Sequence, residues 1–360
     1  MRISVLFLIL SCLLGATGRA QSNKKIDPDA GYIPTVAPED KTKKKKAEET
    51  QALALPPELP TAVVAETDRL AFQVTPLAAK GLLSQQTREA IKGLLHSNRG
   101  PIVKLRAFVA GSGDLRRVGE IVGEMFQEKH QALPALTVVQ VGALPLDGAQ
   151  IEIEATEVDR RIMNPSGVAF VAAQPAATVA ESLAKLRNEM QLSEALLVTC
   201  FVSSLDEQRD TQQAMSAAFP GAAIDYVQMQ RAPVSPAASC EATARITKPG
   251  GATSSQVAVV SSPQIVITGT QLAFGNQDAD LKLAMDRLQR TLEAKGARFD
   301  HVALSHLYIT SSTLASRAPA LRPAGAVYSA LPVEALPSLD SSFGLEVIAV
   351  PESATPHTHD

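Results

Sequence analysis

The feature that most constrains this chain is a strand-turn-strand pattern that occurs three times. Residues 136–158 read LTVVQVGALPLDGAQIEIEATEV, in which a β-branched run, a Leu-Pro break and a turn precede a segment of alternating apolar and polar residues. Weaker copies of the pattern occupy residues 224–246 and 328–350. The pattern predicts three hairpins, each with a half-buried second strand. Three copies of one hairpin in turn indicate three copies of one domain.

The same order of predicted elements precedes each hairpin, which gives the unit β-β-α-β-α-β-β. In the first unit, Ser84 is the expected N-cap of a helix over 85–96, and Asp114 is the expected cap of a second, amphipathic helix. In the second unit, a capping box at 178–181 opens the first helix. The remaining predicted strands are 62–66, 69–74, 102–109, 168–172, 196–202, 258–260, 264–268 and 302–309. Phe108, Phe201 and Tyr308 align the middle strands, and Pro145, Pro233 and Pro337 keep the same spacing.

The length of 360 residues suits two or three domains of ordinary size. We expect an α+β protein in which short joints between the units make neighbouring units pack side by side. The expected segments are a signal peptide at 1–20, a disordered Lys/Pro-rich linker at 21–60, repeat units at 61–160, 163–248 and 255–350, and a flexible tail at 351–360.

The first twenty residues have the pattern of a secretory signal. An apolar run covers residues 3–14, and Gly18-Arg19-Ala20 is a small-x-small cleavage site. We therefore expect export to a periplasm or to the medium, and a lipoprotein box at residues 9–12 is the weaker alternative. No other run is long and apolar enough for a membrane helix, so stable membrane insertion is not expected. Cys200 and Cys240 remain after signal removal, either as a disulfide or as two unbridged core residues, and we favour the second interpretation.

Charge and composition exclude several classes of function. The formal net charge is −3 and aromatic residues make up 4% without any Trp, which argues against a nucleic-acid partner. No metal-binding or phosphate-binding motif occurs, and the terminal pair His357 and His359 is a weak exception, so no metal or other cofactor is expected.

With the three units aligned, the chain resembles the RidA/YjgF/YER057c family, the reactive-intermediate deaminases that are also called L-PSP endoribonucleases. The segments that carry the resemblance are 70–72, 81–88, 103–109, 151–155, 267–272 and 345–349. The resemblance implies a chorismate-mutase-like fold, with a six-stranded sheet and two helices on one face of each unit. Family members are typically homotrimers with ligand clefts between subunits. Three units on one chain imply a monomer that acts as an internal pseudo-trimer.

The resemblance also implies where the chemistry would lie. The family hydrolyses imines and enamines, and an Arg nine residues before the Pro of the Leu-Pro pair binds the substrate carboxylate, a role that suits a bidentate guanidinium. In this chain Leu136, Ile224 and Tyr328 occupy that position. The family's acidic residue maps onto Glu152 in the first unit, but onto Ser239 and Gly344 in the others. The alternate position on these strands holds Glu154, Glu241 and Glu346, which we expect to face solvent.

Glu152 is accordingly the candidate catalytic residue. The candidate ligand-binding residues are Tyr328, Gln271, Gln174, Arg106 and Arg231. Each has a structural alternative: a half-buried aromatic for Tyr328, hydrogen bonding to neighbouring chain for the two glutamines, and a surface residue beside a turn for Arg231. Arg106 aligns with His306, and a lone strand His is more often structural than catalytic.

Two functions follow from this pattern. The first is an exported RidA-like protein without typical deaminase activity, which binds a small metabolite or a protein partner at clefts between its units. The alternative is an exported imine/enamine deaminase, a hydrolase that uses Glu152. The vacant Arg positions favour binding, and the retained Glu152 favours chemistry.

Overall fold

The computed structural model describes residues 55–352 except 192, 207, 231–236 and 249–252. These residues all belong to one compact unit of the chain, Ala54–Asp360. The expected signal peptide, most of the expected linker, Arg231 and the terminal histidines lie outside the described residues. None of the described helices is long and apolar enough to cross a membrane.

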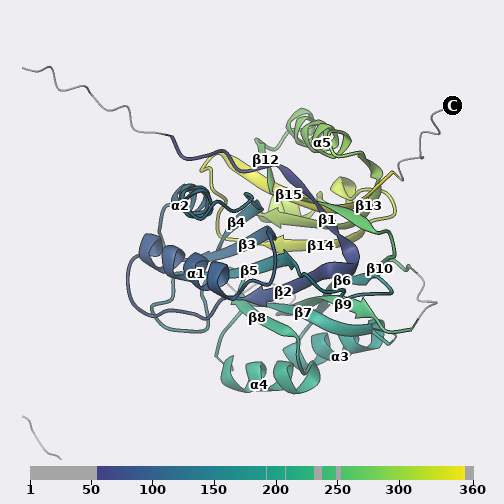
Figure 1. The fold of residues 1–360 in the computed structure, drawn as a ribbon, viewed down its shortest axis with the longest axis horizontal. Coiled ribbons are helices and arrows are strands. Elements are labelled where there is room, and N and C mark those ends of the chain that lie inside the picture. Colours follow the sequence, from purple (N-terminus) through teal and green to yellow (C-terminus); the bar gives the residue numbers. More distant parts are fainter. Residues whose placement is uncertain (1–54, 192, 207, 231–236, 249–252, 353–360) are drawn as a thin grey trace, which may run out of the picture. The chain divides into compact units, whose positions relative to one another are not determined.

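The chain is an α+β protein in which three sheets lie inside and the helices lie around them (Figure 1). The first sheet has the order β2 (Leu70–Val74), β5 (Ile151–Val158), β3 (Ile102–Ala110), β4 (Ala135–Val141). The second has the order β10 (Val257–Val260), β6 (Val168–Ala176), β9 (Ala238–Ile246), β7 (Ser193–Val202), β8 (Ala223–Gln228). The third has the order β1 (Ala62–Glu66), β11 (Gln264–Thr268), β15 (Ser341–Pro351), β13 (Ala297–Ile309), β14 (Val327–Pro332), and β12 (Gln271–Phe274) also pairs with β15. The helices are α1 (Leu83–Ser97), α2 (Leu115–Glu128), α3 (Val179–Glu189), α4 (Gln208–Ala218), α5 (Asp278–Glu293) and α6 (Ser312–Ala315), with short 3-10 turns at Thr67–Arg69 and Ala318–Leu321.

The predicted hairpins are wrong, although their strands are present. In every sheet the middle strand (β3, β7 or β13) pairs in parallel with the next strand and antiparallel with the last one. The two strands of each predicted hairpin therefore flank the middle strand and do not pair with each other. The reason is the helix that follows each middle strand. A helical crossover connects parallel strands, so the next strand pairs on one side of the middle strand. The last strand then pairs on the other side.

Two strands, β1 and β10, belong to a different sheet from the strand that follows them in the chain. β1 pairs antiparallel with β11 of the third sheet, from Ala62 opposite Thr268 to Glu66 opposite Gln264. Likewise, β10 pairs with β6 of the second sheet. The sheets consequently have four, five and six strands, where six in each was expected.

Most of the predicted helix caps are confirmed. Asp114 accepts a hydrogen bond from the Arg116 amide at the start of α2, and Thr178 accepts one from the Glu181 amide at the start of α3. The capping box predicted at 178–181 is only half formed, because the Glu181 side chain does not accept a hydrogen bond from the Thr178 amide. The prediction for Ser84 is wrong, because Leu82 is the N-cap of α1 and the Gln85 side chain accepts a hydrogen bond from its amide at 3.0 Å.

Each sheet is buried on both faces. One face of each packs on its helices, which gives three separate apolar cores. The other faces pack against one another through two further apolar clusters, one around Phe108, Phe201 and Tyr308 and one around Leu70 and Phe170. The last strands are thus fully covered, and the expectation of half-buried strands is wrong.

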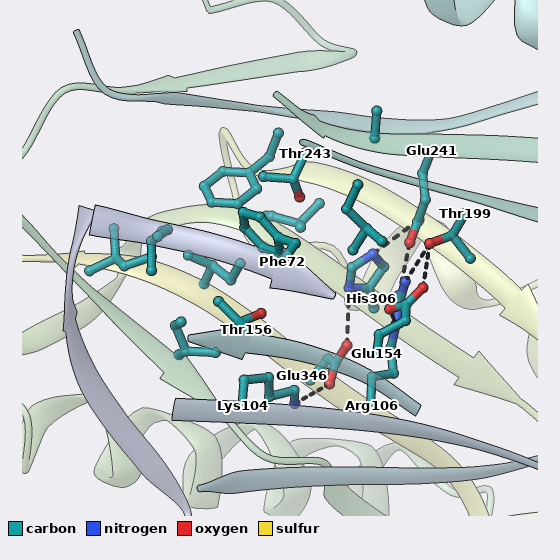
Figure 2. Close-up of a pocket in the computed structure, with 18 of the residues that line it drawn as sticks. Phe72, Lys104, Arg106, Glu154, Thr156, Thr199, Glu241, Thr243, His306 and Glu346 are labelled. Carbon is teal, nitrogen blue, oxygen red and sulfur yellow. Dashed lines mark hydrogen bonds and ion pairs between the residues drawn. The ribbon is translucent and has the colours of Figure 1, made fainter. Parts of the chain in front are cut away.

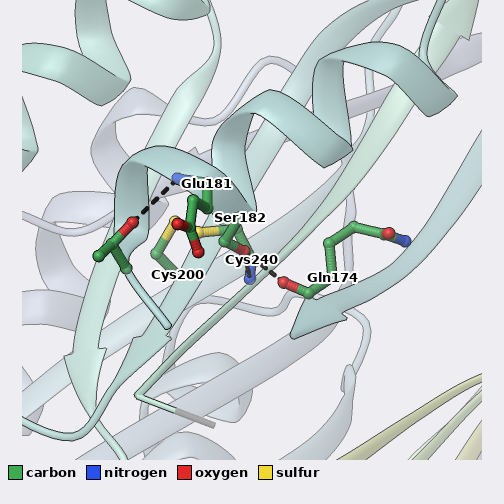
Figure 3. The surroundings of a disulfide bond; sticks show 6 residues. Gln174, Glu181, Ser182, Cys200 and Cys240 are labelled. Atoms are coloured by element: carbon green, nitrogen blue, oxygen red, sulfur yellow. Dashed lines mark hydrogen bonds between the residues drawn. A yellow bond between two sulfur atoms is a disulfide. The ribbon is translucent and has the colours of Figure 1, made fainter. Parts of the chain in front are cut away.

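Cys200 and Cys240 form a disulfide, so the favoured interpretation of two unbridged cysteines is wrong. The two residues lie directly opposite each other on β7 and β9, inside the core between the second sheet and its helices. Ser182 of α3 lies beside them and accepts a hydrogen bond from the Cys240 amide at 2.8 Å (Figure 3).

Candidate functional site

Buried charged side chains from all three sheets meet in one internal cavity (Figure 2). The same register position is used in each sheet: Arg106 lies opposite Glu154, Thr199 opposite Glu241, and His306 opposite Glu346. These six side chains are buried, as is that of Lys104. We call the charged members, Lys104, Arg106, Glu154, Glu241, His306 and Glu346, the central ion-pair network.

The network alternates in sign from one end to the other. Lys104 Nζ is 2.6 Å from Glu346 Oε2, and Glu346 Oε1 is 3.1 Å from His306 Nδ1. His306 Nε2 is 3.0 Å from Glu241 Oε2. Arg106 then bridges two carboxylates, with Nη1 2.8 Å from Glu241 and Nε 2.6 Å from Glu154. Every buried carboxylate of the network therefore contacts a cationic group or His306.

The pKa values follow from these contacts. Burial alone would raise the pKa of Glu241, but His306 and Arg106 outweigh it and lower the pKa to about 2. Burial alone would lower the pKa of His306, yet Glu241 and Glu346 raise it to about 9, so this imidazole is charged at neutral pH. The pKa of Lys104 is lowered, because its burial outweighs the attraction of Glu346.

The network corrects the expectation that Glu154, Glu241 and Glu346 face solvent. Residue alternation identified their shared face correctly, but that face is covered by the neighbouring sheets. The cavity beside the network has a volume of about 70 Å³, which is enough for a few waters and too small for most metabolites. Arg106, a predicted ligand-binding residue, is thus engaged in buried ion pairs.

The retained Glu152 lines a different site, a wide groove open to solvent with a volume of about 690 Å³, which we call the Glu152 cleft. Its wall on the first unit is the loop 74–77 with Phe72, Pro145 and Leu146. Its other wall is Gln212 and residues 221–224 of the second unit, which end at Ile224, one of the vacant Arg positions. The structure thus places Glu152 and Ile224 in one cleft between the first and second sheets.

Asp225, which follows Ile224 on β8, pairs electrostatically with Glu152. Burial and the negative charge of Glu154 raise the pKa of Glu152 to about 8, against the opposing effect of its contact with Asp225. Burial and then the charges of Glu152 and Glu154 raise the pKa of Asp225 well above its usual range. Glu152 Oε2 and both carboxyl oxygens of Asp225 are buried and receive no hydrogen bond from a donor of the described residues. The two carboxyl groups therefore share a proton at neutral pH.

The sequence analysis missed Asp225. Its register position corresponds to Thr137 and Ser329 on β4 and β14, so all three units carry a polar residue directly after the vacant Arg position. The signal available in the sequence was the charged residue Asp225 between apolar residues of a predicted strand.

Leu136, the first vacant Arg position, lies in a second cleft of about 230 Å³ between β4 and the third unit. Gln271 lines this cleft, as does Thr270, whose hydroxyl donates to the Thr137 hydroxyl at 2.7 Å. The acidic position is Gly344 here, and a Cβ atom on it would lie 2.5 Å from Thr270 Cγ2. This cleft, the Leu136 cleft, has neither the Arg nor space for the acid.

The remaining candidates are not brought into one pocket. The Tyr328 hydroxyl is buried without a hydrogen-bond partner among the described residues, and burial raises its pKa to about 12. Gln174 donates to the Ala172 carbonyl at 2.8 Å and to Gln256 Oε1 at 3.1 Å. Hydrogen bonds to nearby segments of the same chain therefore explain this buried side chain.

The observed architecture is that of an α+β protein with sheets packed face to face and clefts between the sheets. Residues 70–158 match the endoribonuclease L-PSP family. This match agrees with the expected resemblance to the RidA/YjgF family for residues 70–158.

Solved structures similar to the chain include two family members and one enzyme. A YjgF/YER057c/UK114 family protein from Mycobacterium tuberculosis is 21% identical over 26% of this chain and 82% of its own, with a TM-score of 0.22. A YjgF family protein from Neisseria meningitidis is 18% identical over 25% and 82%, with a TM-score of 0.22. A chorismatase is 11% identical over 81% of this chain and 77% of its own, with a TM-score of 0.41. Among curated proteins nothing matches the chain.

Proposed function

We propose that this chain is an exported, single-chain pseudo-trimer of three RidA-like units that binds a small molecule in the clefts between units and lacks typical deaminase activity. The shared register of the three sheets supports three related units. The exchange of β1 and β10 between sheets supports a monomer whose units assemble within one chain. The proposed unit boundaries are those of the sequence, 61–160, 163–248 and 255–350.

The observation that carries the loss of deaminase activity is the chemistry of the Glu152 cleft. The family's reaction needs a cation for the substrate carboxylate beside the acid, but this cleft presents Ile224 and has Asp225 behind it. A carboxylate entering the cleft would meet the Glu152 carboxyl group and no guanidinium among the lining residues. Desolvation without an opposite charge disfavours such a complex.

The Leu136 cleft supports the same conclusion independently. It offers Gln271 and Thr270 as hydrogen-bonding groups and apolar walls from Leu136 and Leu272. Arg116 also lines it, but its guanidinium is paired with Asp114 at 3.2 Å. Polar groups of this number in an otherwise apolar cleft are typical of a binding site. Because Gly344 replaces the acid, no carboxyl group is present at the position from which the family positions water.

Two observations support export. The first is the signal-like sequence of residues 1–20. The second is the Cys200–Cys240 disulfide, because such bonds persist in oxidising compartments such as a periplasm or the medium.

The test is turnover of 2-iminobutyrate, generated in situ and followed as release of the ketoacid. We expect background release from the native protein and from a Glu152→Gln variant. A third variant, Ile224→Arg, returns the guanidinium to its family position and acts as the gain-of-function control. Native turnover that is lost in Glu152→Gln would overturn the proposal.

That outcome would instead support a hydrolase that uses Glu152. One observation favours this second candidate: a carboxyl group with a pKa of about 8 holds its proton at neutral pH and is suited to general acid catalysis.

A further inference from the structure

We propose that the Glu152 cleft binds a small organic cation, a primary ammonium or a guanidinium with a short alkyl chain. This inference rests on the proposed binding function and specifies the ligand class of one cleft. It reverses the charge preference that the family's Arg would give.

The first argument is the set of unpartnered atoms. Glu152 lines the cleft and is 6% exposed, and Asp225 lies behind it at 1%. Apart from the proton that the two carboxyl groups share, Glu152 Oε2 and both Asp225 oxygens have no donor among the described residues. Buried polar atoms of this kind are rare in native proteins, because each one loses its hydrogen bonds to water. Ammonium and guanidinium groups are donors only, with several N–H groups each, and could supply the missing hydrogen bonds.

The second argument is the lack of a competing cation. None of the residues that line the Glu152 cleft is a Lys or an Arg. Arg106, which could otherwise neutralise this region, is held by Glu154 and Glu241 in the central ion-pair network. Glu154 adds a negative charge near the carboxyl pair, which itself holds a proton at pH 7. A cationic ligand would therefore meet no Lys or Arg among the residues that line the cleft.

The third argument is the shape and polarity of the remaining wall. Phe72, Leu77, Leu146 and Ile224 give the cleft an apolar side, and its volume of about 690 Å³ lies within the range of small-ligand sites. An alkyl chain of a few carbons can cover this wall while its charged end reaches Glu152. Fully hydrated inorganic cations would leave the wall uncovered.

A bound cation also replaces the proton that the two carboxyl groups share. At pH 7 the pair holds this proton, and the positive charge of the ligand favours its release. Binding should therefore release protons near pH 7 and few at pH 9, where the pair has already begun to lose its proton. Proton release distinguishes this site from nonspecific attraction to a surface carboxylate, which is ionised at both pH values.

Isothermal titration calorimetry of the full chain tests the inference with n-butylammonium, n-butylguanidinium and butyrate. We expect both cations to bind and butyrate not to bind. At pH 7 the cation enthalpy should depend on the ionisation enthalpy of the buffer. Glu152→Gln and Asp225→Asn should each weaken cation binding by at least about tenfold, since a charge-assisted hydrogen bond is lost. Glu194→Gln, which changes a surface carboxylate paired with Arg245, should not affect binding.

Three results would overturn the inference: binding of butyrate, binding of none of the probes, or equal cation affinity in the native protein and all variants. All substitutions are near-isosteric, so the variants should fold, and circular dichroism checks that they do. If the two site variants weaken binding alike, a local defect in one of them does not explain the loss. The ketoacid assay remains a separate measurement. A protein that binds no cation and releases no ketoacid would refute the ligand class while leaving the loss of deaminase activity intact.

Discussion

Replacing Arg106 by Met should destabilise the protein far more than removing any surface ion pair. Its guanidinium contacts Glu154 at 2.6 Å and Glu241 at 2.8 Å, and the three side chains are between 5% and 8% exposed. Removing one partner of a buried pair costs about 3–5 kcal/mol, because the remaining charge stays buried without compensation. Arg106 also lies over the rings of Phe108 and Phe201, at 5.2 and 5.7 Å, which adds about 0.5–2 kcal/mol. We therefore expect a loss of about 4–6 kcal/mol in the free energy of unfolding.

The chain offers a closely matched control. Arg245 contacts Glu194 at 2.6 Å, the same separation as the Arg106–Glu154 pair, but the side chains are 34% and 50% exposed. For such a pair, Arg245→Met should cost about 0–1 kcal/mol. Guanidinium chloride denaturation of both variants at pH 7 measures the difference. A gap below about 1 kcal/mol between them would refute the view that buried charge compensation stabilises the centre of the molecule.

The same variant has a pH signature. Without Arg106, the carboxyl group of Glu241 loses a guanidinium that favours its charged form, so its pKa rises. The variant then binds protons on folding, and its deficit relative to the native protein should shrink as the pH falls from 7 towards 5. A deficit that stays constant over this range would contradict the electrostatic explanation.

Three further predictions concern pH and redox state. The pKa of His306 is raised to about 9 in the folded state, so its stabilising contribution is complete below the unfolded value of 6.5 and is lost as the pH rises through 9. Denaturation between pH 6 and 10 should therefore show a loss of about 3 kcal/mol in the free energy of unfolding. The His306→Gln variant should not show this loss. The pKa of Glu152 is raised to about 8, so its folded carboxyl group is favoured only while protonated, and stability is lost as the pH rises from 4.5 through 8. Glu152→Gln should therefore gain several kcal/mol relative to the native protein between pH 5 and pH 9, and equal differences at both pH values would contradict this. Replacing both Cys200 and Cys240 by Ala opens a link between residues 40 apart, for which chain entropy predicts a loss of about 4 kcal/mol in denaturant titrations; an unchanged transition midpoint would exclude it.

Local sequence patterns predicted much of the secondary structure. The strands, the amphipathic helices and the caps at Asp114 and Thr178 depend on residues close in the chain, and the structure has them. The alignment through Phe108, Phe201 and Tyr308 also agrees with the strand register, since each lies opposite the expected acidic position, which holds Glu152, Ser239 or Gly344.

The errors arose where distant segments decide the outcome. Alternation along β5 correctly separated Glu154 from its apolar neighbours, but it carried no information about what covers the polar face. A sheet face that looks solvated from its own sequence becomes buried when two other sheets supply cations for it, as Arg106 and His306 do for Glu241. Strand exchange and the Cys200–Cys240 disulfide depend on long-range pairing in the same way.

The central ion-pair network also indicates why the units could diverge on one chain. In a symmetric homotrimer, every unit must supply the same residue at a given position. Here the equivalent positions hold Arg106, Thr199 and His306, and the cations of the first unit compensate carboxylates of all three sheets. On the proposed three-unit architecture, covalent linkage removes the symmetry requirement, so that one unit can supply charges for the others. The clefts then no longer need identical residues either. This is consistent with a single retained Glu152 and with different residues at the three vacant Arg positions.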